Sequence, residues 1–284
     1  MLRFHLLGPV GIMTRPNVGS SIAKPQIRAL LVALLRDPGQ HVPFDRLAEH
    51  LWTTPPASAR ANMRTHIATL RKALDACAPG LGRRIETRRA GSDGASAYRL
   101  VVTPEQVDAY RFTDLTAQGQ HHLATGQPLA AVQDLTTALD LWRGPVGEDL
   151  PNTLPLRSWA TLLTERRLTA TEDLAQARLI LGDHTGLVAR LRDHATENPL
   201  RERATALLMQ ALHATDDRPG AVAAYQQHRI RLADELGMRP SAHLRDLYQA
   251  LLREAPPSGT QTHPGQLTPP SLGDRPVSTA GAPG

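Results

Sequence analysis

The sequence predicts a mixed fold, in which a small α+β domain comes first and an all-α domain of helical repeats follows it. Three observations support this prediction: short apolar segments broken by Gly and Pro in the first hundred residues, amphipathic helical patterns after them, and an excess of Lys and Arg confined to the first hundred residues. A chain of 284 residues is long enough for two such domains. We expect the domains at 1–102 and 103–254, and a disordered tail at 255–284 because that segment is rich in Pro, Gly, Thr and Ser.

The N-terminal domain begins with a small sheet and a helix. Residues 2–13 mix apolar side chains with Gly8, Pro9 and Gly11, which is typical of short strands joined by a tight turn. From Pro25 to Arg36 the sequence predicts an amphipathic helix, because apolar residues recur at helical spacing: Ile27, Leu30, Leu31, Leu34 and Leu35.

Two more helices follow, from about Phe44 to Trp52 and from Ser58 to Ala76. The last of them carries a narrow apolar stripe: Met63, Ile67, Leu70 and Leu74. No acidic residue lies between Arg60 and Lys72, and the face opposite the stripe is left for solvent or a ligand.

Two strands, from Arg84 to Arg89 and from Ala97 to Val102, complete the first domain as a hairpin around the turn-rich segment AGSDGAS. The first domain is thus expected to contain strands, two helices, a basic helix and a hairpin, in this order. A positive field confined to this domain favours a polyanionic partner, of which nucleic acid is the usual one, over a merely solvated basic surface.

From Thr103 onward the sequence predicts helix after helix, separated by short Gly and Pro breakers. Similar helix-turn-helix units begin near Gly182 and Asp216, and a spacing of about 34 residues is the tetratricopeptide period. Trp142 and Trp159 end apolar stripes, which favours core packing over a role as exposed partner anchors. The run Arg201-Glu202-Arg203 predicts a charged helix start, to which we assign no function.

Several classes of site are disfavoured, and we expect no enzyme, no metal and no cofactor. The single cysteine, Cys77, excludes an internal disulfide and lacks the partners of a catalytic thiol. We expect His121-His122 in or near a loop, where adjacent histidines make a poor metal pair, and the neighbours Glu172-Asp173 do not face one another. No signal peptide or membrane span is evident, so we expect a cytoplasmic protein.

The chain resembles the Streptomyces antibiotic regulatory protein family over residues 2–254. In the first domain the resemblance is carried by RFHLLGPV, IRALLVALL, DRLAEHLW, ARANMRTHIATLRKAL and YRLVV; in the second, by VDAYRF, LDLWRGP, ERRLTATEDLAQARLILGDH, NPLRERATALLMQAL and AVAAYQQHRIRLADELGMRPS. The sequence departs from the family where GSDGAS lengthens the hairpin tip and where Thr53-Thr54 replaces a common Gly-Asp.

This resemblance implies a winged helix of the response-regulator output type, followed by a bacterial transcriptional activation domain. It also implies a homodimer on DNA that binds direct repeats near the promoter −35 element. The protein would then recruit RNA polymerase holoenzyme as an activator of antibiotic or other secondary-metabolite genes.

In a helix-turn-helix protein the outer face of the recognition helix reads the major groove of double-stranded DNA. We expect Asn62 to contact adenine, Arg64 guanine or phosphate, and the Thr65 or Thr69 methyl groups thymine. The basic residues expected on phosphates or in the wing complete the site: Arg60, Arg71, Lys72, Arg88 and Arg89. For Asn62, Arg64 and Thr65 the alternative is helix capping or plain solvation, and for Arg88 and Arg89 it is a solvated hairpin. His66 fits a structural role as well as a functional one.

Two other functions stay open. The helical repeats could serve as a scaffold whose winged helix binds protein, although an acid-free outer helix face favours DNA. Promoter occupancy could also produce repression in place of activation, and the dimer could form before DNA binding or on the DNA.

Overall fold

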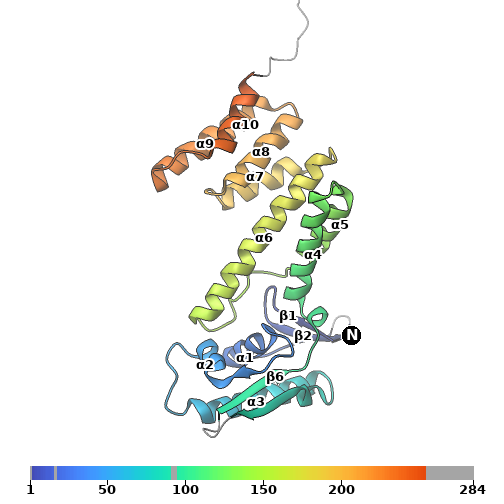
Figure 1. Ribbon diagram of the computed structural model, residues 1–284, viewed down its shortest axis with the longest axis vertical. Coiled ribbons are helices and arrows are strands. Elements are labelled where there is room, and N and C mark those ends of the chain that lie inside the picture. The colour runs from blue at the N-terminus through green and yellow to red at the C-terminus, as the bar shows by residue number, and fades with distance from the viewer. Residues whose placement is uncertain (1, 16–17, 91–94, 254–284) are drawn as a thin grey trace, which may run out of the picture.

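The computed structural model describes residues 2–15, 18–90 and 95–253, and it is elongated, with the α+β domain at one end (Figure 1). This arrangement confirms the predicted fold class, a winged helix-turn-helix followed by helical repeats. The hairpin tip 91–94 and the tail 255–284, for which we predict a turn and disorder, lie outside the described residues. The domain boundaries stay predictions.

Two small antiparallel sheets frame the first domain. Strands β1 (Arg3–His5), β2 (Gly11–Arg15) and β3 (Val18–Ser21) form one sheet in that order. The other has the order β4-β6-β5 and comprises β4 (Val42–Pro43), β6 (Ala95–Leu100) and β5 (Ile85–Ala90). The hairpin prediction is confirmed with a shift at the ends, while β3 and β4 were not predicted because both are too short to show a periodic pattern.

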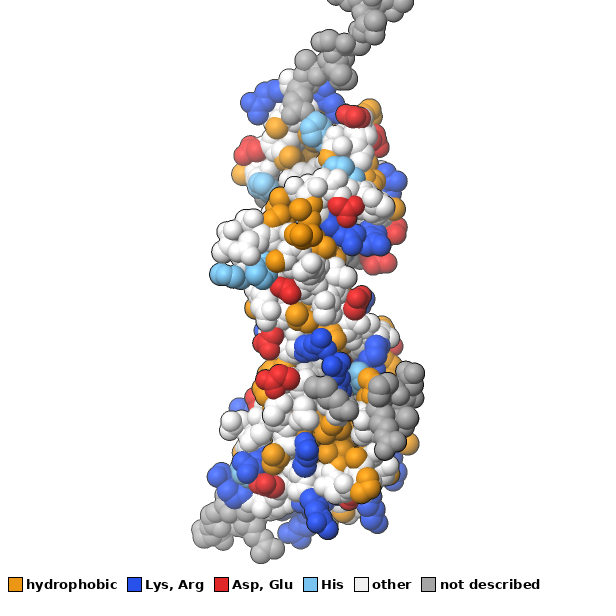
Figure 2. Space-filling view, turned by 90° about the vertical axis from the view of Figure 1, so that its right-hand side faces the viewer, with side chains coloured by type: hydrophobic (Ala, Val, Ile, Leu, Met, Phe, Trp, Pro, Cys, Tyr) orange, Lys and Arg blue, Asp and Glu red, His pale blue; other side chains and the backbone are white. Residues whose placement is uncertain are grey.

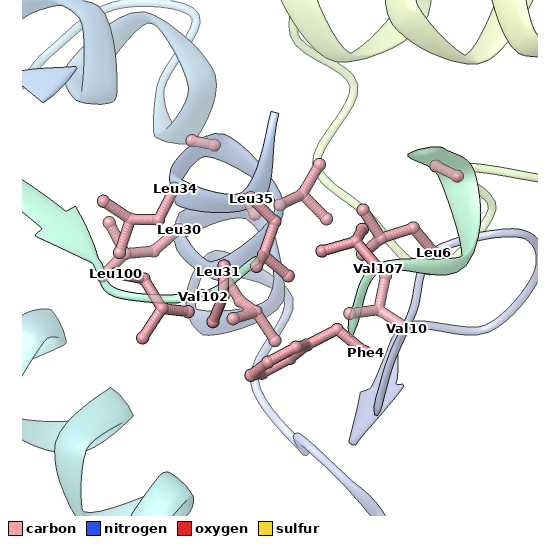
Figure 3. Packing of buried hydrophobic residues seen from close by; sticks show 14 of the residues in the cluster. Phe4, Leu6, Val10, Leu30, Leu31, Leu34, Leu35, Leu100, Val102 and Val107 are labelled. Atoms are coloured by element: carbon pink, nitrogen blue, oxygen red, sulfur yellow. The ribbon is translucent and has the colours of Figure 1, made fainter. Parts of the chain in front are cut away.

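Three helices fill the space between the sheets: α1 (Pro25–Leu35), α2 (Phe44–Leu51) and α3 (Ala59–Cys77). Each lies within one or two residues of its predicted range. From Ala29 to Leu35 every side chain of α1 is buried, because this helix is covered on all sides. Figure 3 shows its leucines gathered in one cluster with Phe4, Leu100, Val102 and Val107.

The second domain consists of seven helices within the described residues. They are α4 (Asp108–Ala124), α5 (Pro128–Leu139), α6 (Leu154–Ile180), α7 (Leu187–Glu197), α8 (Glu202–Ala214), α9 (Arg218–Leu236) and α10 (Ala242–Arg253). Gly182 and Asp216 occupy equivalent turns, both with positive φ, as the repeat spacing predicted. His121 and His122 lie in the last turn of α4, within the helix but near the loop that begins at Thr125, which agrees with the expected position in or near a loop. Short single-turn helices, η1 (Leu81–Arg84) and η2 (Pro104–Gln106), complete the chain.

A continuous hydrophobic core joins the winged helix to α4, α5 and α6. Trp142 and Trp159 are half-buried against this core, as predicted, and Trp142 meets Phe112 edge to face. Polar contacts reinforce the junction: the buried Asp108 carboxylate accepts hydrogen bonds from the backbone amides of Leu6 at 2.7 Å and Leu7 at 3.2 Å. The two domains therefore share one core.

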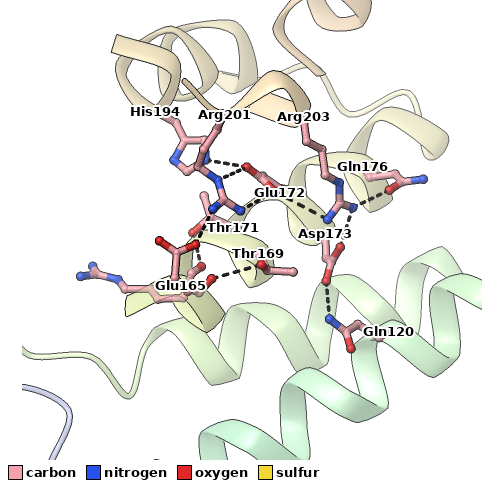
Figure 4. Close-up of polar contacts among 11 residues, drawn as sticks. Gln120, Glu165, Thr169, Thr171, Glu172, Asp173, Gln176, His194, Arg201 and Arg203 are labelled. Atoms are coloured by element: carbon pink, nitrogen blue, oxygen red, sulfur yellow. Dashed lines mark hydrogen bonds and ion pairs between the residues drawn. The ribbon is translucent and has the colours of Figure 1, made fainter. Parts of the chain in front are cut away.

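A buried ion network fixes α7 and α8 to the second half of α6 (Figure 4). The Glu172 carboxylate, 1% exposed, receives two hydrogen bonds from Arg201, at 2.8 and 3.1 Å. Asp173 accepts a hydrogen bond from Arg203 at 2.5 Å and another from Gln120 of α4 at 2.9 Å. The charged run at 201–203, to which the sequence assigned no function, thus stabilises the packing of the repeats.

Candidate nucleic-acid interface

Helix α3 is held by its apolar stripe, which leaves its other face outside the fold. Met63, Ile67, Leu70 and Leu74 are buried against α1, α2 and the first sheet, as the sequence predicted, and Ala59 is buried with them. Because these residues recur every three or four positions, the remaining side chains point away from the core. The acid-free segment from Arg60 to Lys72 extends about 18 Å along the helix axis, more than the width of a major groove.

The side chains on this outer face are available to a ligand in different degrees. Arg64, Thr65 and Lys72 are exposed, while Asn62 and Thr69 are half-buried. Thr65 donates its hydroxyl hydrogen to the Ala61 carbonyl at 3.2 Å, and Thr69 donates to the Thr65 carbonyl at 2.9 Å. With both hydroxyl hydrogens used inside the helix, the groups left for a partner are the methyls and the oxygen lone pairs.

Asn62 and Arg60 lie at the N-terminal turn of α3, and each has an intramolecular contact. The Asn62 amide donates to the Ser58 hydroxyl at 3.1 Å. The Arg60 guanidinium lies over the Phe44 ring, 5.2 Å from its centroid, while its side chain stays exposed. The Arg60 contact orients its positive charge at the helix start without neutralising it.

Arg71 connects α3 to the hairpin. Its Nη2 donates to the Ile85 carbonyl at 2.8 Å and to the Thr87 hydroxyl at 3.1 Å, and its side chain is half-buried. These bonds hold β5 beside α3. A structural role that the sequence pattern did not reveal is therefore established for Arg71, while its phosphate contact stays a prediction.

The two hairpin arginines lie next to each other on β5. The Thr87 hydroxyl accepts a hydrogen bond from Arg71, so the Thr87 side chain faces α3. Because side chains alternate along a strand, the exposed Arg88 lies on the opposite face of the hairpin. Partial burial lowers the pKa of His41, and the charges of Arg88 and Arg99 lower it further, which indicates that both arginines lie near this ring. Arg89 belongs to β5, but its side chain is outside the described residues.

Lys24 is a further basic residue beside α3, which no pattern in the sequence revealed. This exposed residue immediately precedes α1, and burial together with the charge of Lys24 lowers the pKa of His66 on α3. Lys24 therefore adds positive charge next to the outer face of α3. His66 itself is half-buried and its ring lies 5.9 Å from that of Trp52, which indicates packing.

Figure 2 shows that Lys and Arg side chains outnumber Asp and Glu at the end of the molecule that holds the winged helix. One hairpin arginine, Arg99, is neutralised by Glu86 at 2.7 Å. For Arg64, Lys72 and Arg88, in contrast, no acidic partner is found among the described residues. A surface of this kind can bind phosphate groups and present side chains to base edges.

Other kinds of site find no support in the part of the chain that the structure describes. Within it, no three His, Cys, Asp or Glu side chains are grouped closely enough to bind a metal ion. Helices that combine the length and the apolar character needed to cross a membrane are absent from the same residues.

Comparison with known families gives two matches that together cover most of the chain. Residues 22–91 match the family described as "Transcriptional regulatory protein, C terminal", and residues 107–252 match "Bacterial transcriptional activator domain". The boundary between these matches falls at the hairpin and η2, where the fold changes from α+β to helical.

Individual relatives agree with the family matches. The transcriptional regulator RedD of Streptomyces coelicolor is 36% identical over 90% of this chain and 71% of its own length. The regulatory protein DnrI of Streptomyces peucetius is 32% identical over 90% of this chain and 93% of its own length. The solved structure of Mycobacterium tuberculosis EmbR, in complex with a low-affinity phosphopeptide, has a TM-score of 0.80 and 32% identity, and covers 90% of this chain but 66% of the EmbR chain.

Proposed function

The chain belongs to the Streptomyces antibiotic regulatory protein family, and we propose on this premise that it activates secondary-metabolite genes by binding promoter DNA in a sequence-specific manner. That it is a transcriptional regulator follows from the family itself. The proposal concerns the DNA contacts, the regulated genes and the recruitment of RNA polymerase.

The observation that carries the proposal is the outer face of α3. It is presented by a winged helix, lacks acidic residues from Arg60 to Lys72, and is flanked by Lys24 and by the hairpin. A helix of this length and charge fits the major groove, where its side chains reach base edges.

We assign two kinds of contact to these residues. Arg64, Thr65, Thr69 and Asn62 read bases: the arginine a guanine, the threonine methyls thymine, and the amide an adenine. Phosphates are held by the remaining basic side chains: Lys24, Arg60, Arg71, Lys72, Arg88 and Arg89. Because the Nη2 of Arg71 is bonded to the hairpin, this residue can contact a phosphate only through its other guanidinium nitrogens.

We propose that the protein acts in the cytoplasm and binds direct repeats near the −35 element as a homodimer. The helical domain then contacts RNA polymerase holoenzyme. A shared core favours this arrangement, since it holds the helical domain at a fixed position relative to the bound promoter. Repression at some promoters is compatible with the same binding.

The test is a footprint on the promoter regions that flank the gene, at two salt concentrations and with competitor DNA. We expect protection of direct repeats about one helical turn apart. Arg64→Ala should lose about 1 to 3 kcal/mol of preference for the site. Lys72→Ala should weaken binding to all sequences alike and reduce the salt slope by about one.

Two further variants sharpen the result. Thr65→Ser keeps the hydroxyl that bonds to Ala61 but removes the methyl, so it should relax the preference for a single thymine. Arg157→Ala removes an exposed charge from α6 and serves as the matched control. If wild-type protein shows no preference over random DNA, the DNA-binding proposal fails and a scaffold function becomes the better account.

A further inference from the structure

A groove of about 290 Å³ lies between α7, α8 and α9, at the end of the molecule remote from the winged helix. Leu208 and Leu212 of α8 are buried in its floor, and Ala195 and Ala224 line its two walls. The groove follows α9 from Gly220 to Arg231, a distance of about 16 Å at the rise of an α-helix. About five residues of an extended peptide span this length.

The charge of the groove has one sign. Arg192 of α7 and Arg231 of α9 are exposed at its rim, and no acidic side chain is among the residues that line it. No carboxylate among the described residues forms an ion pair with either arginine. Two cations without partners above an apolar floor fit an anionic group attached to an apolar one.

His228 supplies a polar group to the same groove. This residue is 4% exposed, and its Nδ1 lies 3.2 Å from the Thr205 hydroxyl, while Nε2 has no hydrogen-bond partner within the described residues. Burial lowers the pKa of His228, and the charge of Arg231 lowers it further, although Glu202 and the Pro199 carbonyl oppose these effects. Burial therefore favours the neutral form of the ring. Because the Thr205 hydroxyl satisfies Nδ1, Nε2 is the ring nitrogen left for a ligand.

A buried ring nitrogen without a hydrogen-bond partner is unfavourable, and a polar group of a ligand that reaches it removes this cost. We propose that the α7–α9 groove binds a short, extended segment of a partner protein in which an acidic residue neighbours an apolar one. The carboxylate meets Arg192, Arg231 and the Nε2 of His228, and the apolar side chain rests on Leu208 and Leu212. This binding site is separate from the DNA-binding surface and goes beyond the proposed function.

The experiment selects peptides from a displayed library of random octapeptides against the full-length chain, with counter-selection on an Arg192→Ala, Arg231→Ala double variant. Recovered peptides are then labelled, and their binding to full-length protein is measured by fluorescence anisotropy. We expect sequences that combine Asp or Glu with Leu, Ile or Phe, and at least about tenfold weaker binding to Arg231→Ala. Binding should also shift the NMR signals of the His228 ring.

Arg190→Ala is the matched control, because Arg190 is exposed on α7 but does not line the groove. The proposal is overturned if no acidic sequence is enriched, or if Arg190→Ala and Arg231→Ala weaken binding equally. It is also overturned if sedimentation shows a dimer that Arg231→Ala dissociates, since the groove then holds a second copy. DNA binding by Arg231→Ala should equal that of the wild type, so this test and the test of the DNA-binding function can fail independently.

Discussion

Asp108 should be a main determinant of the stability of the shared core, and Asp108→Ala tests this. Its side chain is 6% exposed and accepts hydrogen bonds from the backbone amides of Leu6 and Leu7, 2.7 and 3.2 Å away. In the alanine variant two buried N–H groups lose their acceptor, and each such loss costs about 1 to 3 kcal/mol. Arg143, 3.4 Å from the carboxylate, loses an ion pair as well. Allowing for some entry of water, we expect a loss of about 3 kcal/mol.

Thermal unfolding followed by tryptophan fluorescence is a suitable assay, because Trp52, Trp142 and Trp159 all pack against the shared core. For a protein of this size about 3 kcal/mol corresponds to a decrease in Tm of roughly 6 to 12 °C. Trp52 belongs to the winged helix and the other two belong to the helical domain. If the core is one unit, variants that retain a single tryptophan should report the same midpoint.

Asp114→Ala is the matched control, since Asp114 is an exposed acidic residue on the same helix. It should change stability by no more than about 0.5 kcal/mol. Asp108→Asn keeps one acceptor oxygen and should lose about half as much as Asp108→Ala. A Tm for Asp108→Ala equal to that of Asp114→Ala would refute the reasoning, because it would mean that the two amides find other partners at no cost.

Three further changes should affect stability in defined ways. Lowering the pH from 7.5 to 5.5 should lower the free energy of unfolding: burial lowers the pKa of His50, with a further contribution from Arg36, so the unfolded chain takes up protons that the folded chain does not. The contribution of His50 to the free energy of unfolding is complete above the ordinary histidine pKa of 6.5 and is lost as the pH falls below it. Urea titrations should show that the stability of His50→Gln falls less steeply with decreasing pH than that of the wild type. Equal slopes would contradict the assignment. Gly119→Ala should lower the free energy of unfolding by about 1 to 3 kcal/mol, because a Cβ there would lie 2.6 Å from the Leu135 side chain on α5. Calorimetry tests this, with Ala117→Ser as a control at an exposed position of the same helix. An unchanged Tm for Gly119→Ala would be the contrary result. Glu172→Gln should loosen the packing of α7 and α8 on α6, because Arg201 loses the buried one of its two carboxylate partners and keeps only the exposed Glu165. Hydrogen exchange should then rise in α7 and α8 and not in α1, and equal protection throughout would show that the network is dispensable.

The sequence alone was sufficient for the order and type of the longer elements. In α1 and α3 the apolar spacing is set by the helix itself, so Leu30, Leu34, Met63 and Ile67 could be assigned to the core without knowledge of what covers them. The outer face of α3 followed from the same periodicity, since whatever is not buried must point outward. Short elements such as β4 carry no periodic signal, and only the pairing of Val42 with Tyr98 and of Pro43 with Ala97 on β6 defines that strand.

What the sequence could not show are contacts between residues far apart along the chain. The carboxylate of Asp108 meets amides about a hundred positions earlier, and Arg201 meets Glu172 across a helix junction. Neither contact can be predicted from local sequence patterns, because a hydrogen bond between distant segments produces no regular spacing of residue types. The same reason applies to the α7–α9 groove, whose Arg192 and Arg231 belong to different helices. Helix periodicity thus determined which faces are buried, and tertiary packing decided which buried and exposed groups meet.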